Sequence, residues 1–165
     1  MKKMILTLLV ALPLSVFAQK FAHFNSGEVI QALPEYAAAQ AELQNQSKQF
    51  EDELKRMQDE LQTKAADYEK NMATMVDAIK QRREQELQEL NERMQQYYQQ
   101  SQQALQQLQQ TKLTEISDKV QKAVKEVGVA GGYVYIMDTT SGIPYISETL
   151  STDVTAQVKA KLGLK

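Results

Sequence analysis

The chain has 165 residues and a formal net charge of −2 at pH 7, with no cysteine and a single histidine. This mildly acidic balance disfavours a dedicated nucleic-acid binder, which normally presents a basic face or stripe. The absence of cysteine excludes a disulfide framework and a lipid attached to an N-terminal cysteine.

Residues 1–18 predict a secretory signal peptide, because two lysines precede an apolar segment that ends in the small residue Ala18. The apolar core from Met4 to Phe17 has 14 residues, fewer than the roughly 20 that a helix needs to cross a bilayer. We therefore expect cleavage after Ala18 and secretion into an oxidising compartment, rather than a retained membrane anchor. Cleavage removes Lys2 and Lys3 and changes the formal charge from −2 to −4.

Residues 19–34 predict the first part of a small β body. Lys20–Asn25 is a short strand candidate, and Asn25 with Glu28 three residues later is a capping box that opens a short helix. Pro34 then stands where the first turn of a following helix tolerates proline.

Residues 35–127 predict a long helical arm, because no glycine or proline occurs between Pro34 and Gly128. Apolar residues recur there at intervals of three and four, which is coiled-coil spacing. One straight helix of this length would reach about 140 Å, whereas two antiparallel arms would each reach about half of that. We favour the hairpin, with its tip near residues 71–83, where Thr74 and Asp77 interrupt the apolar spacing.

Residues 128–165 predict the second part of the β body. Gly128 is expected to end the long helix. Tyr133–Met137 is a strong strand candidate, and Ile143–Ile146 is a second strand that Pro144 restricts to a sheet edge. The last helix is expected over Val154–Leu162, capped by Asp153 and closed by Gly163.

Three short strands cannot bury much apolar area in a single copy, so we expect association between chains. Because the two ends of the chain supply the strands, the strands are expected to meet in one sheet from which the arm projects. The expected centre of the association is a set of aromatic and β-branched residues: Phe21, Phe24, Val134, Tyr135 and Ile136.

No catalytic, cofactor or metal site is predicted. His23 is the only histidine and lies in a strand candidate, so a structural role is favoured over a ligand or a base. The glycines around Gly128 precede a strand and lack a phosphate-binding spacing. The Gln-rich segment Gln95–Gln110 is interpreted as a polar outer helix face rather than as an aggregation-prone tract, since the apolar spacing continues beneath it.

These segments together resemble the Skp/OmpH family. KFAHFNSGEVI is similar to the family's opening strand and short helix, and the Gly- and Pro-free middle is similar to its helical arms. GYVYIMD and DVTAQVKAKLG resemble its closing strands and helix. The similarity covers essentially the whole chain after residue 18, and the two terminal segments carry most of its weight.

The resemblance implies a mainly α fold with a small β body, in which long antiparallel coiled-coil arms project from an oligomeric β-barrel as a jellyfish-like homotrimer. It implies an ATP-independent periplasmic holdase that binds unfolded outer-membrane proteins in a cavity between the arms and prevents their aggregation before membrane insertion. It implies no cofactor and no nucleic-acid partner, and it leaves transient contact with the membrane surface open.

On this hypothesis the residues of the arm seam and tip face clients or pack the arm, and the sequence leaves open which of the two each residue does. Methionines among them supply flexible, polarizable side chains that suit varied apolar clients as well as helix packing. The residues are Met57, Leu61, Tyr68, Met72, Met75, Val76, Ile79, Leu87, Leu90 and Met94.

The arm departs from the family in its charge. The best-known members have strongly basic arms, whereas residues 43–127 here contain 13 Lys or Arg and 15 Asp or Glu. The family's basic lipopolysaccharide cluster falls on the Gln-rich segment, which has no basic residue between Arg93 and Lys112, so that site is not transferred. We expect apolar contact rather than electrostatic attraction to hold clients.

The competing interpretation is a structural or adaptor coiled coil of the envelope that binds one folded partner. A seam filled with rigid Leu and Ile pairs would favour the adaptor, whereas the interrupted, methionine-containing seam near the tip favours the chaperone. A small hydrolase is disfavoured by the missing catalytic groups.

Overall fold

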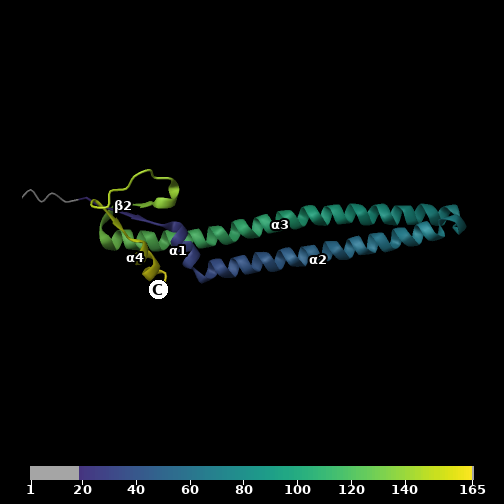
Figure 1. Cartoon of the computed structure of the whole chain (residues 1–165), viewed down its shortest axis with the longest axis horizontal. Helices are drawn as coiled ribbons and strands as arrows, with labels where there is room; N and C mark the ends of the chain where they lie inside the picture. The colour runs from purple at the N-terminus through teal and green to yellow at the C-terminus, as the bar shows by residue number, and fades with distance from the viewer. Residues whose placement is uncertain (1–18, 165) are drawn as a thin grey trace, which may run out of the picture.

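The computed structural model describes residues 19–164, so the signal peptide predicted for residues 1–18 lies outside the described residues. A small body carries one long helical hairpin (Figure 1). The elements in chain order are β1 (Lys20–Phe24), α1 (Ser26–Ala32), α2 (Pro34–Asn71), the 3₁₀ turn η1 (Met72–Thr74), α3 (Asp77–Gly131), β2 (Tyr133–Asp138), η2 (Thr139–Ser141), β3 (Ser151–Asp153) and α4 (Thr155–Lys161). The predicted combination of long helices with a small sheet is confirmed.

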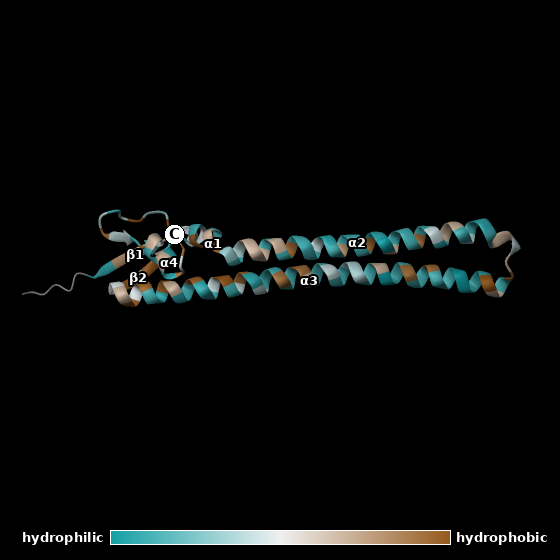
Figure 2. Cartoon of the chain, turned by 90° about the horizontal axis from the view of Figure 1, so that it is seen from below, coloured by the Kyte–Doolittle hydropathy of each residue, from teal (hydrophilic) through white to brown (hydrophobic). Residues whose placement is uncertain are grey.

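The arm consists of α2 and the longer α3, which run antiparallel and side by side along its whole length (Figures 1 and 2). Their 38 and 55 residues correspond to about 57 Å and about 82 Å of helix. The last turns of α3 therefore extend past the start of α2 and pack against α1, α4 and β2 in the body. Among residues 19–164, no helix combines the length and the hydropathy that crossing a membrane requires.

The hairpin reverses without glycine or proline. The 3₁₀ turn η1 directly follows α2, Met75 and Val76 are extended, and α3 begins at Asp77. Asn71 donates from its amide to the carbonyl oxygen of Asp67, and the Thr74 hydroxyl donates to the carbonyl oxygen of Asn71, at 2.9 and 3.0 Å. The Thr74 hydroxyl therefore satisfies a backbone acceptor that the end of α2 leaves free, the carbonyl of Asn71.

The sheet has the order β2-β1-β3, and both strand pairs are parallel. Parallel neighbours need a long crossover connection, and the whole arm is the connection between β1 and β2. One face of the sheet packs on α1, α3 and α4. The core on that side contains Ala22, Phe24, Val29, Leu33, Val127, Val154 and Val158.

Two predicted boundaries are wrong in this region. Ile143–Ile146 forms no strand, and the third strand is Ser151–Asp153. Pro144 has no N–H to donate to a ladder, whereas Ser151–Asp153 pairs in register with the central strand. The long helix ends at Gly131 rather than Gly128, because Gly132 adopts the left-handed conformation that terminates it, with φ of 65°.

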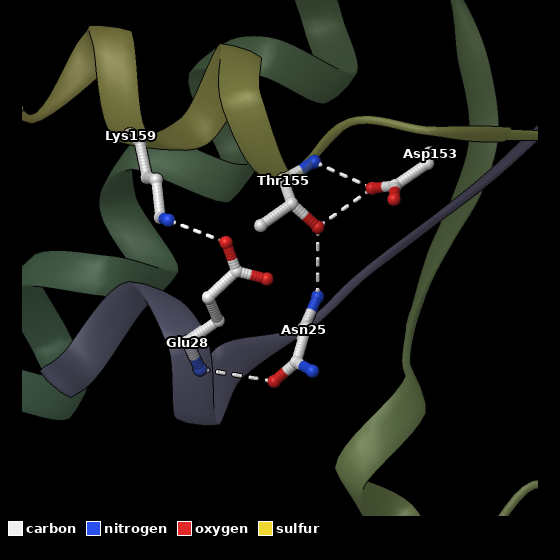
Figure 3. A network of polar contacts seen from close by, with 5 residues as sticks. All are labelled: Asn25, Glu28, Asp153, Thr155 and Lys159. Atoms are coloured by element: carbon white, nitrogen blue, oxygen red, sulfur yellow. Dashed lines mark hydrogen bonds and ion pairs between the residues drawn. The ribbon is translucent and has the colours of Figure 1, made fainter. Parts of the chain in front are cut away.

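A network of polar contacts joins the two ends of the chain in the body (Figure 3). The Asn25 side chain accepts from the Glu28 N–H at 3.0 Å, which confirms the predicted cap of α1. The Asn25 N–H donates to the Thr155 hydroxyl oxygen, and Thr155 donates from its own N–H and hydroxyl to Asp153. Glu28 forms an ion pair with Lys159 of α4 rather than returning to Asn25.

The Asp153 carboxylate predicts that the stability of the body depends on pH in the acidic range. The side-chain hydrogen bond from Thr155 is the largest cause that holds the pKa of Asp153 below its ordinary value of 3.8. A carboxyl with a lowered folded pKa contributes stability above its ordinary pKa and loses it as the pH falls through the folded value. We expect urea stability of the body, followed by tyrosine fluorescence, to fall below about pH 4. Asp153→Asn should reduce this pH dependence, and an unchanged dependence would contradict the assignment.

Candidate functional site

Exposed apolar side chains gather at two places that lie at opposite ends of the molecule. Met72, Val76 and Ile79 are exposed at the arm tip, and the exposed fraction of Val76 is 67%. The second group lies on the body, on the face of the sheet that the helices leave uncovered. Large apolar side chains normally find cover, so both groups are candidate contact surfaces.

The tip surface is built by the reversal itself. Because the extended residues Met75 and Val76 follow η1 directly, the four large apolar side chains of residues 72–79 all lie at the reversal. Met75 is half-buried, whereas Met72, Val76 and Ile79 are exposed. The tip therefore presents a small apolar surface at the end of the α2–α3 hairpin, far from the core of the body.

The remaining seam residues lie between the two arm helices. Met57 and Leu90 are buried, with exposed fractions of 8% and 2%. Leu61, Tyr68, Leu87 and Met94 are half-buried. In a single chain these six side chains are therefore more covered than the exposed residues of the tip. Packing between α2 and α3 accounts for the burial of Met57 and Leu90.

Polar contacts across the arm differ between its two halves. Near the body, Lys112 pairs with Glu42 at 2.8 Å and Lys119 pairs with Glu35. The hydrogen bond from Lys119 is the largest cause that lowers the pKa of Glu35. Exposed ion pairs contribute little stability, so these contacts are consistent with the register of the helices but add little to the stability of the arm.

Toward the tip, the contact across the arm is the hydrogen bond from the Tyr68 hydroxyl to Glu84. Ion pairs such as Arg83–Glu86 join residues of the same helix, and their charges balance locally. The distal arm therefore offers no large field of one sign to attract a charged partner.

The open face of the sheet carries the second apolar surface. The rings of Phe21 and Tyr135 lie 4.9 Å apart between centroids, because β1 and β2 place these residues opposite each other. The connection between β2 and β3 passes over this face, and the two enclose a pocket of about 210 Å³. Ile143, Tyr145, Ile146 and Leu150 line it from the connection.

Of the five residues predicted for association, two pack in or against the core of the chain and three do not. Phe24 is buried in the core of the chain itself, and Ile136 packs against the same core. Phe21, Val134 and Tyr135 lie outside that core, and the last two are exposed. Sequence reasoning missed Met137, Tyr145 and Leu150. Period-two alternation along the strand would have placed Met137 with Tyr135, whereas no sequence pattern marks the connection as a cover for the sheet.

His23 lies in the middle of the central strand, beside the pocket of the open face. Its Nδ1 atom is 2.8 Å from the Ser151 hydroxyl oxygen, so the ring has a polar partner within the sheet. Across residues 19–164, no group of three or more His, Cys, Asp or Glu side chains is arranged to hold a metal ion.

Comparisons with known proteins agree on one family. The model of the family described as "Outer membrane protein (OmpH-like)" matches residues 20–162. A "Chaperone protein Skp" from Photorhabdus laumondii is 30% identical over 154 residues, covering 91% of this chain and 93% of that protein. A protein of the same name from Yersinia pseudotuberculosis is 41% identical over 144 residues, covering 86% and 87%.

The fold also has a solved counterpart. The crystal structure of a putative outer membrane chaperone (OmpH-like) from Caulobacter crescentus CB15 superposes with a TM-score of 0.75. The superposition covers 87% of this chain and 83% of that one at 18% sequence identity. At this identity the likeness shows the shared fold.

Proposed function

The chain belongs to the OmpH-like outer membrane protein family, and from this premise we propose that it is an ATP-independent holdase for unfolded outer-membrane proteins in the periplasm. Its similarity to Skp chaperones supports a chaperone role for outer-membrane proteins. The holdase binds clients through the arms and prevents their aggregation until the membrane receives them.

The arm tip is the observation that carries this proposal. Burying a Val, Ile or Met side chain contributes about 1.5–3 kcal/mol, and at the tip the exposed parts of Met72, Val76 and Ile79 leave a share of that free energy available to a partner. An unfolded outer-membrane protein exposes apolar side chains on alternate residues of its future strands. Contacts with such a chain are numerous and individually weak, which allows release without nucleotide.

The open face of the sheet supports a homotrimeric body. Its apolar side chains have no cover from the helices, and the outer edges of β2 and β3 carry backbone groups without a strand partner among the described residues. Three copies that join these faces and edges form a small β-barrel, from which three arms enclose a cavity. This interface includes the residues that line the pocket of the open face: Phe21, Tyr135, Met137, Tyr145 and Leu150.

The direct experiment dilutes a urea-unfolded outer-membrane β-barrel protein into buffer that contains the purified mature chain and no nucleotide. We expect light scattering from client aggregates to be suppressed at three copies of the chain per client. Bovine serum albumin at equal mass serves as the control for nonspecific protein. Failure with several such clients would favour the adaptor that binds one folded partner.

A further inference from the structure

The arm contains a shallow groove between its helices whose exposed side chains are all uncharged. The groove has a volume of about 530 Å³ and lies in the half of the arm nearer the body. Two half-buried leucines, Leu43 and Leu105, lie along it between the helices. Its polar lining consists of Gln44 and Ser47 from α2 and Gln102, Gln106 and Gln109 from α3.

The α3 side of this groove differs from the rest of the arm in charge. From Met94 to Thr111, no residue of α3 is charged, and Arg93 and Lys112 bound the segment. The segment spans about five turns of helix, or about 27 Å. Elsewhere along the arm, acidic and basic side chains alternate and pair with one another.

The glutamine side chains of the groove have donors and acceptors to offer. Among residues 19–164, Gln44, Gln102, Gln106 and Gln109 take part in no recorded side-chain hydrogen bond, whereas Gln85 and Gln88 are each bonded to a glutamate on the same helix. A primary amide carries two N–H donors and an acceptor oxygen, the same groups that a polypeptide backbone presents. A charged side chain would offer either donors alone or acceptors alone.

We propose that this amide groove binds an extended segment of an unfolded polypeptide through its backbone, with side chains of the segment resting on Leu43 and Leu105. The proposal rests on the proposed holdase function and adds a second surface for client contact, together with its chemistry. An unfolded chain has unpaired backbone N–H and C=O groups at every residue, so such a surface binds clients of any sequence.

Weak binding follows from the exposure of the groove. Its amides exchange hydrogen bonds with water for hydrogen bonds with the client, so each net contribution is small. Many such hydrogen bonds together bind a client only while it remains unfolded. When the client folds into β-structure, the same backbone groups pair with one another and are no longer free to bind the groove. The groove thereby discriminates unfolded clients from folded ones without an energy source.

The test compares two triple variants of α3 that add the same charge. Gln102→Glu, Gln106→Glu and Gln109→Glu replace amides that line the groove, and each change removes two donors while keeping the side-chain shape. Gln100→Glu, Gln103→Glu and Gln107→Glu are the matched control, because these exposed glutamines do not line the groove. Circular dichroism and sedimentation velocity check that helix content and oligomeric state match in all three proteins.

The measurement is the affinity for a fluorescently labelled, uncharged segment of an unfolded outer-membrane protein, obtained by anisotropy. We expect the groove variant to bind at least about tenfold more weakly than the wild type, and the control variant to stay within about twofold. Equal affinity of the two variants would overturn the groove while leaving the holdase intact. A change of oligomeric state in the groove variant alone would assign the groove to contact between copies, and no binding by the wild type would instead refute the holdase function.

Discussion

Replacing both Tyr135 and Met137 with aspartate is expected to give a folded chain that no longer forms trimers. Both side chains lie on the open face of β2 and are exposed in the single chain, so the charges remain hydrated in the monomer. In the proposed trimer they would be buried without partners, which costs several kcal/mol for each charge. Sedimentation velocity should therefore show monomers at concentrations where the wild type is trimeric.

Substitution of Tyr135 and Met137 tests association between chains, whereas substitution of Ile136 would test folding of the body. Ile136 packs against the core of its own chain, so a charge there would unfold the body instead of separating subunits. Tyr98 is an exposed tyrosine on α3, and Tyr98→Asp is the control for adding charge at an exposed ring. A double variant that stays trimeric would show that the open face is not the interface.

The second large effect is expected at the arm tip. Replacing Met72, Met75, Val76 and Ile79 together with serine should weaken client binding by at least about tenfold, or about 1.4 kcal/mol. The trimer and its helix content should remain, because the four residues lie at the far end of the arm from the sheet. Client anisotropy measures the loss, and circular dichroism checks the helices.

Two controls separate tip contact from other forces. Tyr98→Ser with Val129→Ser removes exposed apolar side chains elsewhere on α3 and should leave affinity within about twofold. A salt series tests electrostatic capture, which weakens as the Debye length falls to about 8 Å at physiological ionic strength. Full activity of the quadruple variant, or a steep loss of wild-type affinity with salt, would return the charged faces of the arm to the mechanism.

The long elements could be predicted because their signals are local. The absence of glycine and proline across the middle of the chain predicts long helix, and the continuous run of mainly aromatic and β-branched residues Tyr133–Met137 predicts a strand, without help from the rest of the fold. Asn25 was identified as a cap for the same reason. The third strand has only Ser, Thr and Asp, and its pairing with β1 depends on tertiary contacts that no residue pattern reveals.

The candidate surfaces depend on geometry that spacing alone does not provide. The seam pattern marks Met57 and Val76 alike, yet one is buried and the other is at the reversal. The Gln-rich segment was visible in the sequence, but its groove includes Gln44 and Ser47 because of the register between α2 and α3. That register depends on contacts between the two helices, such as the packing of Met57 and Leu90, which are not local in sequence.

The central claim is that the chain holds unfolded outer-membrane proteins in solution. The dilution experiment tests this claim most directly when the size of the resulting complexes is measured. A urea-unfolded outer-membrane β-barrel protein is mixed with the mature chain at three copies per client, without nucleotide, and analysed by sedimentation velocity. The account predicts that the client remains soluble and sediments with the trimer as one complex. A client that aggregates while the trimer sediments alone would contradict it.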